Sequence, residues 1–231
     1  MFRFGQVSVF GLAISGVAFA QAYPHAFPRQ GATKLFENER VIVWDATWPI
    51  GVEQPIHQHK YDMALVFLRY GKIKVTTPAG KVSIAEPFEV PRPMYQARGV
   101  THKEEAIGNA GDSERHAIMV DLKDFTPPPM AAKPGMEPAF PREGAKDVID
   151  NARVRFWDFT WPANKALAQH VHQTDSVEIF VSDGTLRTRL ADGHEQAQPV
   201  HYGYARFVPR GQVDTEEAVN GTPRAFTIEI K

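Results

Sequence analysis

Short hydrophobic runs recur along the whole chain, and Gly, Pro and Asp separate them. They are rich in β-branched and aromatic residues, the composition typical of strands. No amphipathic pattern long enough for a three-turn helix stands out. The pattern therefore predicts an all-β protein, with its main strands at 39–48, 63–77, 115–122, 152–161, 176–190 and 224–230.

The chain also contains an internal repeat. The segment FPRQGATKLFENERVIVWDATWP (27–49) matches FPREGAKDVIDNARVRFWDFTWP (140–162), and the same offset of 113 residues continues to Gly80, with 19 identities in 54 aligned pairs. After a small deletion, 98–106 aligns with 210–218. A duplication of this extent is the signature of two similar structural units.

Each copy contains several short strands, and closing them into a sandwich or barrel removes the unpaired edges of an open sheet. The segment 124–141 holds six prolines, which indicates an extended connection between the copies. We therefore predict two tandem β-barrels, over 27–123 and 140–231, that a Pro-rich linker at 124–139 connects.

The first twenty residues differ from the rest. A basic start at Arg3 precedes an uncharged segment that ends in Ala18-Phe19-Ala20, the small-x-small pattern of a signal peptidase site. We predict a signal peptide over 1–20, cut after Ala20 or after Ala22, and export to the periplasm or medium. The alternative, a membrane anchor, fits less well because the segment is rich in Gly and Ser, and we expect no stable membrane insertion after cleavage.

Composition narrows the function classes. The chain is 43% hydrophobic and 23% charged, as in globular proteins, and it contains no cysteine, which excludes disulfides and thiolate chemistry. Without Arg3, 25 basic residues face 27 acidic ones, a formal charge near −2. This balance gives no reason to expect a nucleic-acid partner.

A His-x-His pair occurs in both copies. His57 and His59 stand one residue apart, and alternation in a strand sends such residues to one face, where they could hold a metal ion or act as polar residues at a strand end. His170 and His172 repeat the pair, and the first copy alone adds His102 downstream. Because the pair recurs and His102 adds a third histidine, a metal site is the favoured interpretation for the first copy. For the second copy, a metal site and a purely structural role are more evenly balanced.

The spacing of these residues resembles the cupin motifs. Gly51-x5-His57-x-His59 and, in the second copy, Gly203-x5-Pro209-x-Gly211-x2-Asp214 match the family pattern in part. The resemblance covers both copies, and it implies a bicupin with two jelly-roll barrels. It also implies metal ligands, carried over as His57, His59 and His102 in the first barrel and His170, His172 and Asp214 in the second.

The glutamate among the family's ligands has no counterpart here. On this alignment Ala64 and Val177 occupy its place, and Glu178, one residue further, would face the other way without a bulge. Asp62 and Asp175 share the parity of the missing position, so Asp62 is a further candidate ligand. The alternative that both are turn residues is favoured.

Other residues could complete a site in the first copy. Phe67, Met94 and Tyr95 could line the apolar part of a pocket, and Arg92 or Arg98 could bind a carboxylate. The adjacent pairs Glu104–Glu105 and Glu216–Glu217 are weak acid or base candidates, because neighbours in a strand face opposite sides and are usually solvated.

Three functions fit these residues. The first is a metal-dependent, dioxygenase-like enzyme that acts on a small organic molecule at the three-histidine site, and the second is a lyase, decarboxylase or isomerase of a sugar acid or dicarboxylate. The third is a non-catalytic protein that binds or stores a small ligand or metal. Three imidazoles suit a divalent transition metal, Fe(II) as the first expectation and Zn, Mn, Ni or Cu as alternatives. A homo-oligomer is an open option.

Overall fold

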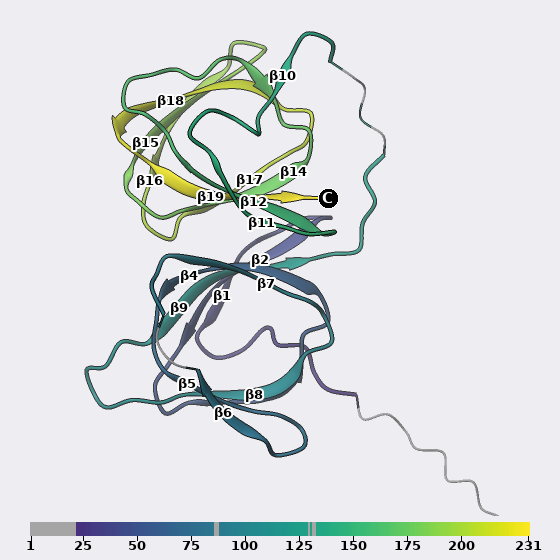
Figure 1. Ribbon diagram of the computed structural model, residues 1–231, viewed down its shortest axis with the longest axis vertical. Helices are drawn as coiled ribbons and strands as arrows, with labels where there is room; N and C mark the ends of the chain where they lie inside the picture. The colour runs from purple at the N-terminus through teal and green to yellow at the C-terminus, as the bar shows by residue number, and fades with distance from the viewer. Residues whose placement is uncertain (1–21, 86–87, 129, 131–132) are drawn as a thin grey trace, which may run out of the picture.

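The computed structural model describes residues 22–85, 88–128, 130 and 133–231, and the predicted signal peptide lies outside this part. The described residues form β-strands, turns and loops without a helix, and so include no helix that could cross a membrane. The strands form two jelly-roll barrels stacked along the long axis of the molecule (Figure 1). The predicted fold class is confirmed.

The first barrel contains two sheets that face each other. The five-stranded sheet has the order β1 (Ala32–Glu37), β2 (Val41–Trp48), β9 (Arg115–Leu122), β4 (Asp62–Arg69) and β7 (Arg92–Gln96). The four-stranded sheet has the order β3 (Glu53–Gln58), β8 (Thr101–Ala106), β5 (Ile73–Thr76) and β6 (Val82–Ala85). All pairings are antiparallel.

The second barrel repeats this arrangement. One sheet has the order β11 (Lys146–Asp150), β12 (Val154–Thr160), β19 (Arg224–Ile230), β14 (Asp175–Phe180) and β17 (Ala205–Val208). The other has the order β10 (Glu137–Pro138), β13 (His170–Val171), β18 (Val213–Gly221), β15 (Gly184–Leu190) and β16 (Glu195–Val200). The short β10 pairs with β13 in parallel, as His25 does with Gln58 in the first barrel.

The two barrels pack through the sheet that contains β4 in the first barrel and the sheet that contains β14 in the second. One cluster of buried side chains draws on both sheets, with Val41, Val66 and Ile118 on one side and Phe156 and Ile228 on the other. A separate apolar cluster fills the interior of each barrel. Strands β4 and β14 are therefore buried on both faces, which explains why their sequences read as nearly continuous apolar runs.

Two ion pairs cross the interface between the barrels. Arg40 Nε lies 3.0 Å from Asp175 Oδ2, and Arg153 Nε lies 3.0 Å from Asp62 Oδ2. Each arginine also points an Nη2 group at the last strand of the other barrel, at Ile230 O and at Leu122 O. The residues of one pair are the repeat counterparts of the other, so the interface has an approximate twofold symmetry.

Candidate metal centre

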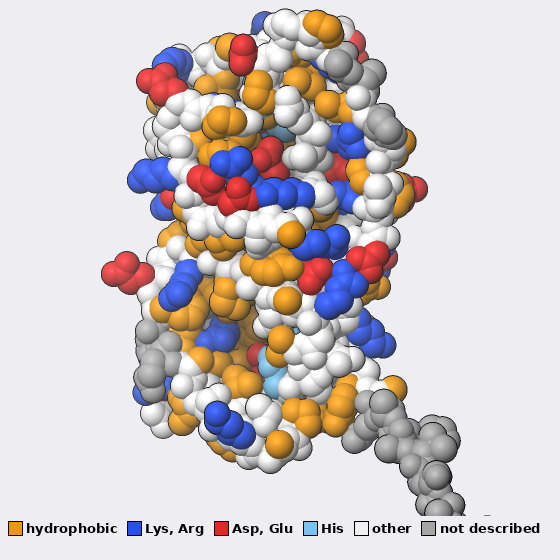
Figure 2. All heavy atoms as spheres, turned by 45° about the vertical axis from the view of Figure 1, so that its right-hand side comes forward, with side chains coloured by type: hydrophobic (Ala, Val, Ile, Leu, Met, Phe, Trp, Pro, Cys, Tyr) orange, Lys and Arg blue, Asp and Glu red, His pale blue; other side chains and the backbone are white. Residues whose placement is uncertain are grey.

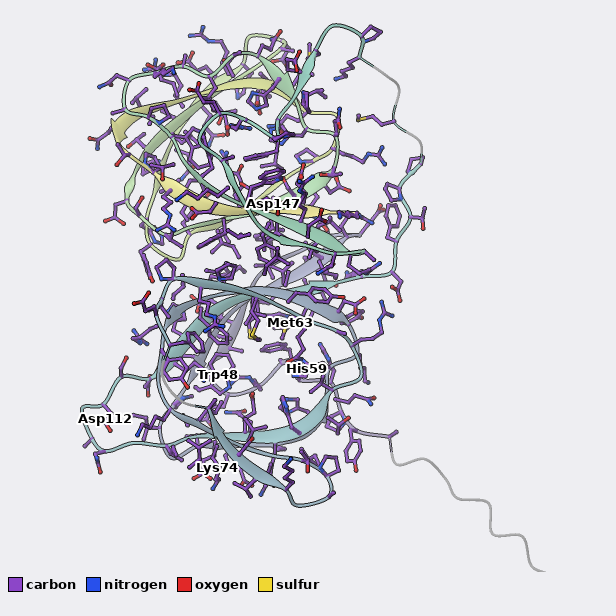
Figure 3. All side chains as sticks on the ribbon, viewed as in Figure 1. Trp48, His59, Met63, Lys74, Asp112 and Asp147 are labelled. Atoms are coloured by element: carbon purple, nitrogen blue, oxygen red, sulfur yellow. The ribbon has the colours of Figure 1, made fainter. Side chains whose placement is uncertain are left out.

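Strands β3 and β8 bring the three predicted histidines of the first barrel together. His57 pairs in register with His102, and His59 follows the end of β3, where its backbone N–H donates to Val100 O at 2.9 Å. One ring nitrogen from each histidine lies within 4.8 Å of the others. The three side chains are 4–8% exposed. Figure 3 shows His59 inside the first barrel, with Trp48 and Met63.

The hydrogen bonds of the histidines leave nitrogen lone pairs for a metal. His57 Nδ1 lies 2.8 Å from Pro55 O and donates to it, so its Nε2 carries the lone pair. His59 Nε2 and His102 Nε2 face each other at 3.3 Å. Burial lowers the pKa of His57, and burial with the neighbouring His102 and His57 lowers that of His59 to about 3. Neutral imidazoles aimed at one point fit a divalent metal.

Glu104, which was only a weak acid or base candidate from the sequence, belongs to this site. It lies two residues after His102 on β8, so both side chains face the barrel interior. Its Oε2 accepts the indole N–H of Trp48 at 2.8 Å, and its Oε1 lies 3.5 Å from His102 Nε2. Burial opposes its ionisation, but His102, Trp48 and Arg29 outweigh that effect and lower its pKa. Shared parity with a predicted ligand was the signal that could have found it, while Glu105 pairs outward with Lys74.

A cavity of about 250 Å³ opens beside the three histidines. Figure 2 shows histidines in an opening of the first barrel, with hydrophobic side chains around it. Phe67 and Met94 line the cavity as predicted, whereas Tyr95 packs towards the other barrel. The remaining apolar lining comes from Ala26, Phe27, Trp48, Met63, Leu65, Val75 and Met119.

The arginines of the cavity are not the two that the sequence suggested. Arg98 binds Asp62 and Asp124, and Arg92 is exposed beside Phe88. Instead Arg29, from the segment before β1, and Arg115, at the start of β9, line the cavity. Burial lowers the pKa of Arg29 to about 10 and also lowers that of Arg115.

The structure places Asp62 away from the histidines. Its carboxylate accepts the backbone N–H of Arg98 at 3.0 Å and pairs with Arg98 and Arg153. Asp62 and Ala64 lie on the face of β4 that packs against the second barrel, whereas Met63 and Leu65 line the cavity. The proposed ligand role of Asp62 was therefore wrong, because its parity turns it to the opposite face of the strand.

The second barrel also brings its predicted residues together. Asp214 Oδ1 lies 2.9 Å from His170 Nε2 and 3.6 Å from His172 Nε2. Since His170 Nδ1 is already bonded to Ala168 O, its contact with Asp214 needs a proton or a metal on Nε2. Burial lowers the pKa of His170, but the bond to Asp214 and the charge of Glu216 together outweigh it and raise the value. Burial raises the pKa of Asp214, but its bonds to His170 and His172 and its other partners outweigh that effect and lower it. A protonated His170 can therefore pair with the Asp214 carboxylate without a metal.

Charged residues fill the interior of the second barrel. Glu178 and Arg206 stand where the first barrel has Leu65 and Met94, and they pair at 2.6 Å. Arg206 also pairs with Glu216, the counterpart of Glu104, at 2.6 Å. A cavity of about 550 Å³ reaches His170, but neither His172 nor Asp214 lines it. The open three-ligand site with its own cavity is thus in the first barrel.

No protein-family model matches the sequence, and no curated protein matches it. Solved structures do match. Oxalate decarboxylase from Bacillus subtilis, in a study of its Mn(II) centres, is 16% identical over 87% of this chain and 72% of its own, with a TM-score of 0.56. AerE from Microcystis aeruginosa is 10% identical over 91% and 99%, with a TM-score of 0.60. A cupin 2 conserved barrel domain protein from Leptotrichia buccalis is 10% identical over 87% and 88%, with a TM-score of 0.52. These likenesses show that the chain has the cupin fold.

Proposed function

We propose that the protein is an exported bicupin whose first barrel is a metal-dependent enzyme for a small organic molecule. In this proposal a leader over 1–20 is removed and 124–139 connects barrels at 27–123 and 140–231. The observation that carries it is the convergence of His57, His59 and His102 beside a cavity. These histidines would hold a divalent transition metal, with Fe(II) as the first choice and Zn, Mn, Ni or Cu as alternatives.

A metal with three protein ligands keeps open coordination positions, and bound there it would supply oxygen activation or Lewis acidity. The chain supplies the surroundings. The apolar lining restricts water, and Pro55 fixes the orientation of His57 through the hydrogen bond to Nδ1. Ionised Glu104, held by Trp48, offers Oε1 as a proton acceptor at the cavity. This arrangement supports oxygenation of a small substrate as the first candidate reaction.

A second candidate reaction comes from the fold comparison. Several matching structures are of oxalate decarboxylase, and in one of them the metal is Mn(II). A decarboxylase or lyase would use the same three histidines, with the metal as Lewis acid towards a carboxylate. Fold likeness at this level of identity carries over no substrate, so the reaction must be tested directly.

The metal is tested first. Protein purified from the exported fraction should contain about one metal ion per chain, and the double variant His57→Ala/His59→Ala should lose it. The matched double variant His170→Ala/His172→Ala changes the same residue types in the second barrel and should retain it. Full metal occupancy after the first-barrel substitutions would refute the assignment.

The reaction is tested next with the metal-loaded protein. Oxygen uptake is followed against panels of thiols, phenols and diketones, and CO₂ release against small carboxylic acids under nitrogen. Oxygen uptake that Glu104→Gln diminishes would support the oxygenase, and CO₂ release without oxygen would support the second candidate. Saturable binding without turnover in either assay would refute an enzyme and leave a binding protein.

A further inference from the structure

The first-barrel cavity contains more hydrogen-bond donors than the protein satisfies. Among the described residues, buried donors without a partner include Arg29 Nη2, Arg115 Nη2 and Gln96 Nε2, and all three residues line this cavity. Buried polar groups are normally paired, and an unpaired one costs free energy on folding. The two guanidinium donors both lie near Trp48, so they indicate that an acceptor belongs in that part of the cavity.

The charges of the cavity are also unbalanced. Arg29 and Arg115 are two cations, and Glu104 is the carboxylate that lines the cavity with them. In the described part of the chain neither arginine forms an ion pair at contact distance; Arg29 Nη1 donates to Gln30 O and Thr47 O, and Arg115 Nε to Gly71 O. Both guanidinium groups lie near the Trp48 ring, at 4.4 and 5.9 Å from its centre. One positive charge near this ring therefore has no counter-ion.

The second barrel provides an internal comparison. Arg142, the counterpart of Arg29, donates to Glu216 at 3.2 Å, and Arg206 pairs with Glu178 and Glu216. Pro223 and Val208 occupy the positions of Arg115 and Gln96 on the equivalent strands, so these donors do not exist there. The same fold thus pairs its interior arginines with carboxylates in one barrel, whereas in the described part of the other barrel Arg29 and Arg115 have no ion pair at contact distance and share one carboxylate, Glu104.

We propose that the first barrel binds a small amphiphilic carboxylate, whose carboxyl group Arg29 and Arg115 receive beside Trp48 and whose apolar body packs on the methionine and leucine side of the cavity, where Gln96 pairs in register with Met63. This inference rests on the proposed function of that barrel as a small-molecule site. Carboxylates match guanidinium groups in charge and shape. Met63, Leu65, Met94 and Met119 offer the adaptable apolar surface that a hydrocarbon body requires.

The same lining selects against the smallest dicarboxylates. Oxalate has no apolar body, so it would desolvate its second carboxylate against thioether and leucine side chains. The cavity of about 250 Å³ is also below the roughly 300–1,000 Å³ of drug-sized sites. A compact aryl or alkyl monocarboxylate fits both its size and its polarity.

Calorimetry at pH 7 tests this with phenylacetate, its neutral isostere phenylacetamide, and oxalate. Metal-free protein, prepared by chelation, removes direct coordination as a source of affinity. Phenylacetate should bind at least about tenfold more tightly than phenylacetamide, as expected when a charged hydrogen bond is at stake, and more tightly than oxalate. Equal affinity for the acid and the amide, or tighter binding of oxalate, would overturn the inference, and this comparison requires no variant.

Variants then locate the carboxylate. Arg29→Gln and Arg115→Gln should each weaken phenylacetate binding about tenfold or more and leave phenylacetamide unchanged, with the unfolding midpoint as a check on folding. Arg92→Gln, in the same barrel but exposed outside the cavity, should change nothing. An equal loss in Arg92→Gln would contradict the assignment. Metal content and turnover are measured separately, so carboxylate binding without turnover would refute only the proposed function.

Discussion

The two interface ion pairs test how burial determines the loss of stability when a charged side chain is left without its partner. Both join an arginine to an aspartate of the other barrel at 3.0 Å. Arg40 and Asp175 have side chains only 6% and 8% exposed, whereas Arg153 is 29% exposed. Asp62 also contacts Arg98, which is 42% exposed and keeps Asp124 as a second partner. Equivalent substitutions in the two pairs should therefore lower the free energy of unfolding by different amounts.

Asp175→Asn leaves Arg40 buried with the carbonyls of Phe125 and Ile230 as its remaining hydrogen-bond partners among the described residues. Removing one member of a buried pair costs about 3–5 kcal/mol, and we expect about 3 kcal/mol because the Nε contact lacks the alignment of a hydrogen bond. Asp62→Asn leaves arginines that water or Asp124 can reach, so its cost should be about 1 kcal/mol. Either asparagine still accepts the backbone N–H of Arg210 or Arg98 through Oδ1.

The assay is urea unfolding at pH 7, followed by tryptophan fluorescence, with the midpoint and slope compared between variants. The Asp175→Asn loss should exceed the Asp62→Asn loss by about 2 kcal/mol. Arg40→Met added to Asp175→Asn should recover most of the lost stability, because it removes the stranded charge. Equal losses at the two positions, or no recovery in the double variant, would refute the role assigned to burial.

Three further outcomes are expected. Burial raises the pKa of Asp62, but the hydrogen bonds from Arg98 outweigh that effect and lower the pKa. The stabilisation that ionised Asp62 provides is therefore complete above about pH 4 and is lost as the pH falls through the lowered pKa. Thermal unfolding should accordingly show the stabilities of the wild type and Asp62→Asn converging in acid. Arg206→Met strands Glu178 inside the second barrel and should cost about 3 kcal/mol or more in urea unfolding, while Glu178→Leu/Arg206→Met, which copies the first barrel, should recover most of it. His102→Ala should weaken metal retention in dialysis against a chelator, whereas His116→Ala, which loses only a contact to Asp45, should not.

The repeat and the strand pattern were sufficient to predict two all-β units and the two His-x-His pairs. The alignment of the two copies defined the units, and alternation along a strand placed His57 and His59 on one face. His102 came instead from the resemblance to the cupin motifs, and the structure pairs it in register with His57. The first two inferences depend on local geometry and on comparison within the chain, so they needed no knowledge of how the barrels pack.

The orientation of β4 could not be predicted in the same way. Its residues are buried on both faces, so the sequence has no polar alternation to distinguish the cavity side from the interface side. Motif spacing put Ala64 at the position of the family's glutamate and made Asp62 a candidate ligand by parity, although the turn interpretation was favoured; the packing of the second barrel shows that both residues lie on the interface side. Arg29 and Arg115 come from distant segments, and only the closed barrel brings them to the histidines.

The packing between the barrels also explains how the two interiors can differ so much. The sheets that contain β4 and β14 each have an apolar outer face that the other barrel covers, so the second barrel contributes to stability whatever its interior contains. The residues inside the second barrel can therefore differ from those that line the first-barrel cavity. Glu178 and Arg206 can occupy space that Leu65 and Met94 line beside the cavity of the first barrel, because they neutralise each other and Glu216. The arrangement thus allows an open cavity in one barrel and a charged, internally paired interior in the other.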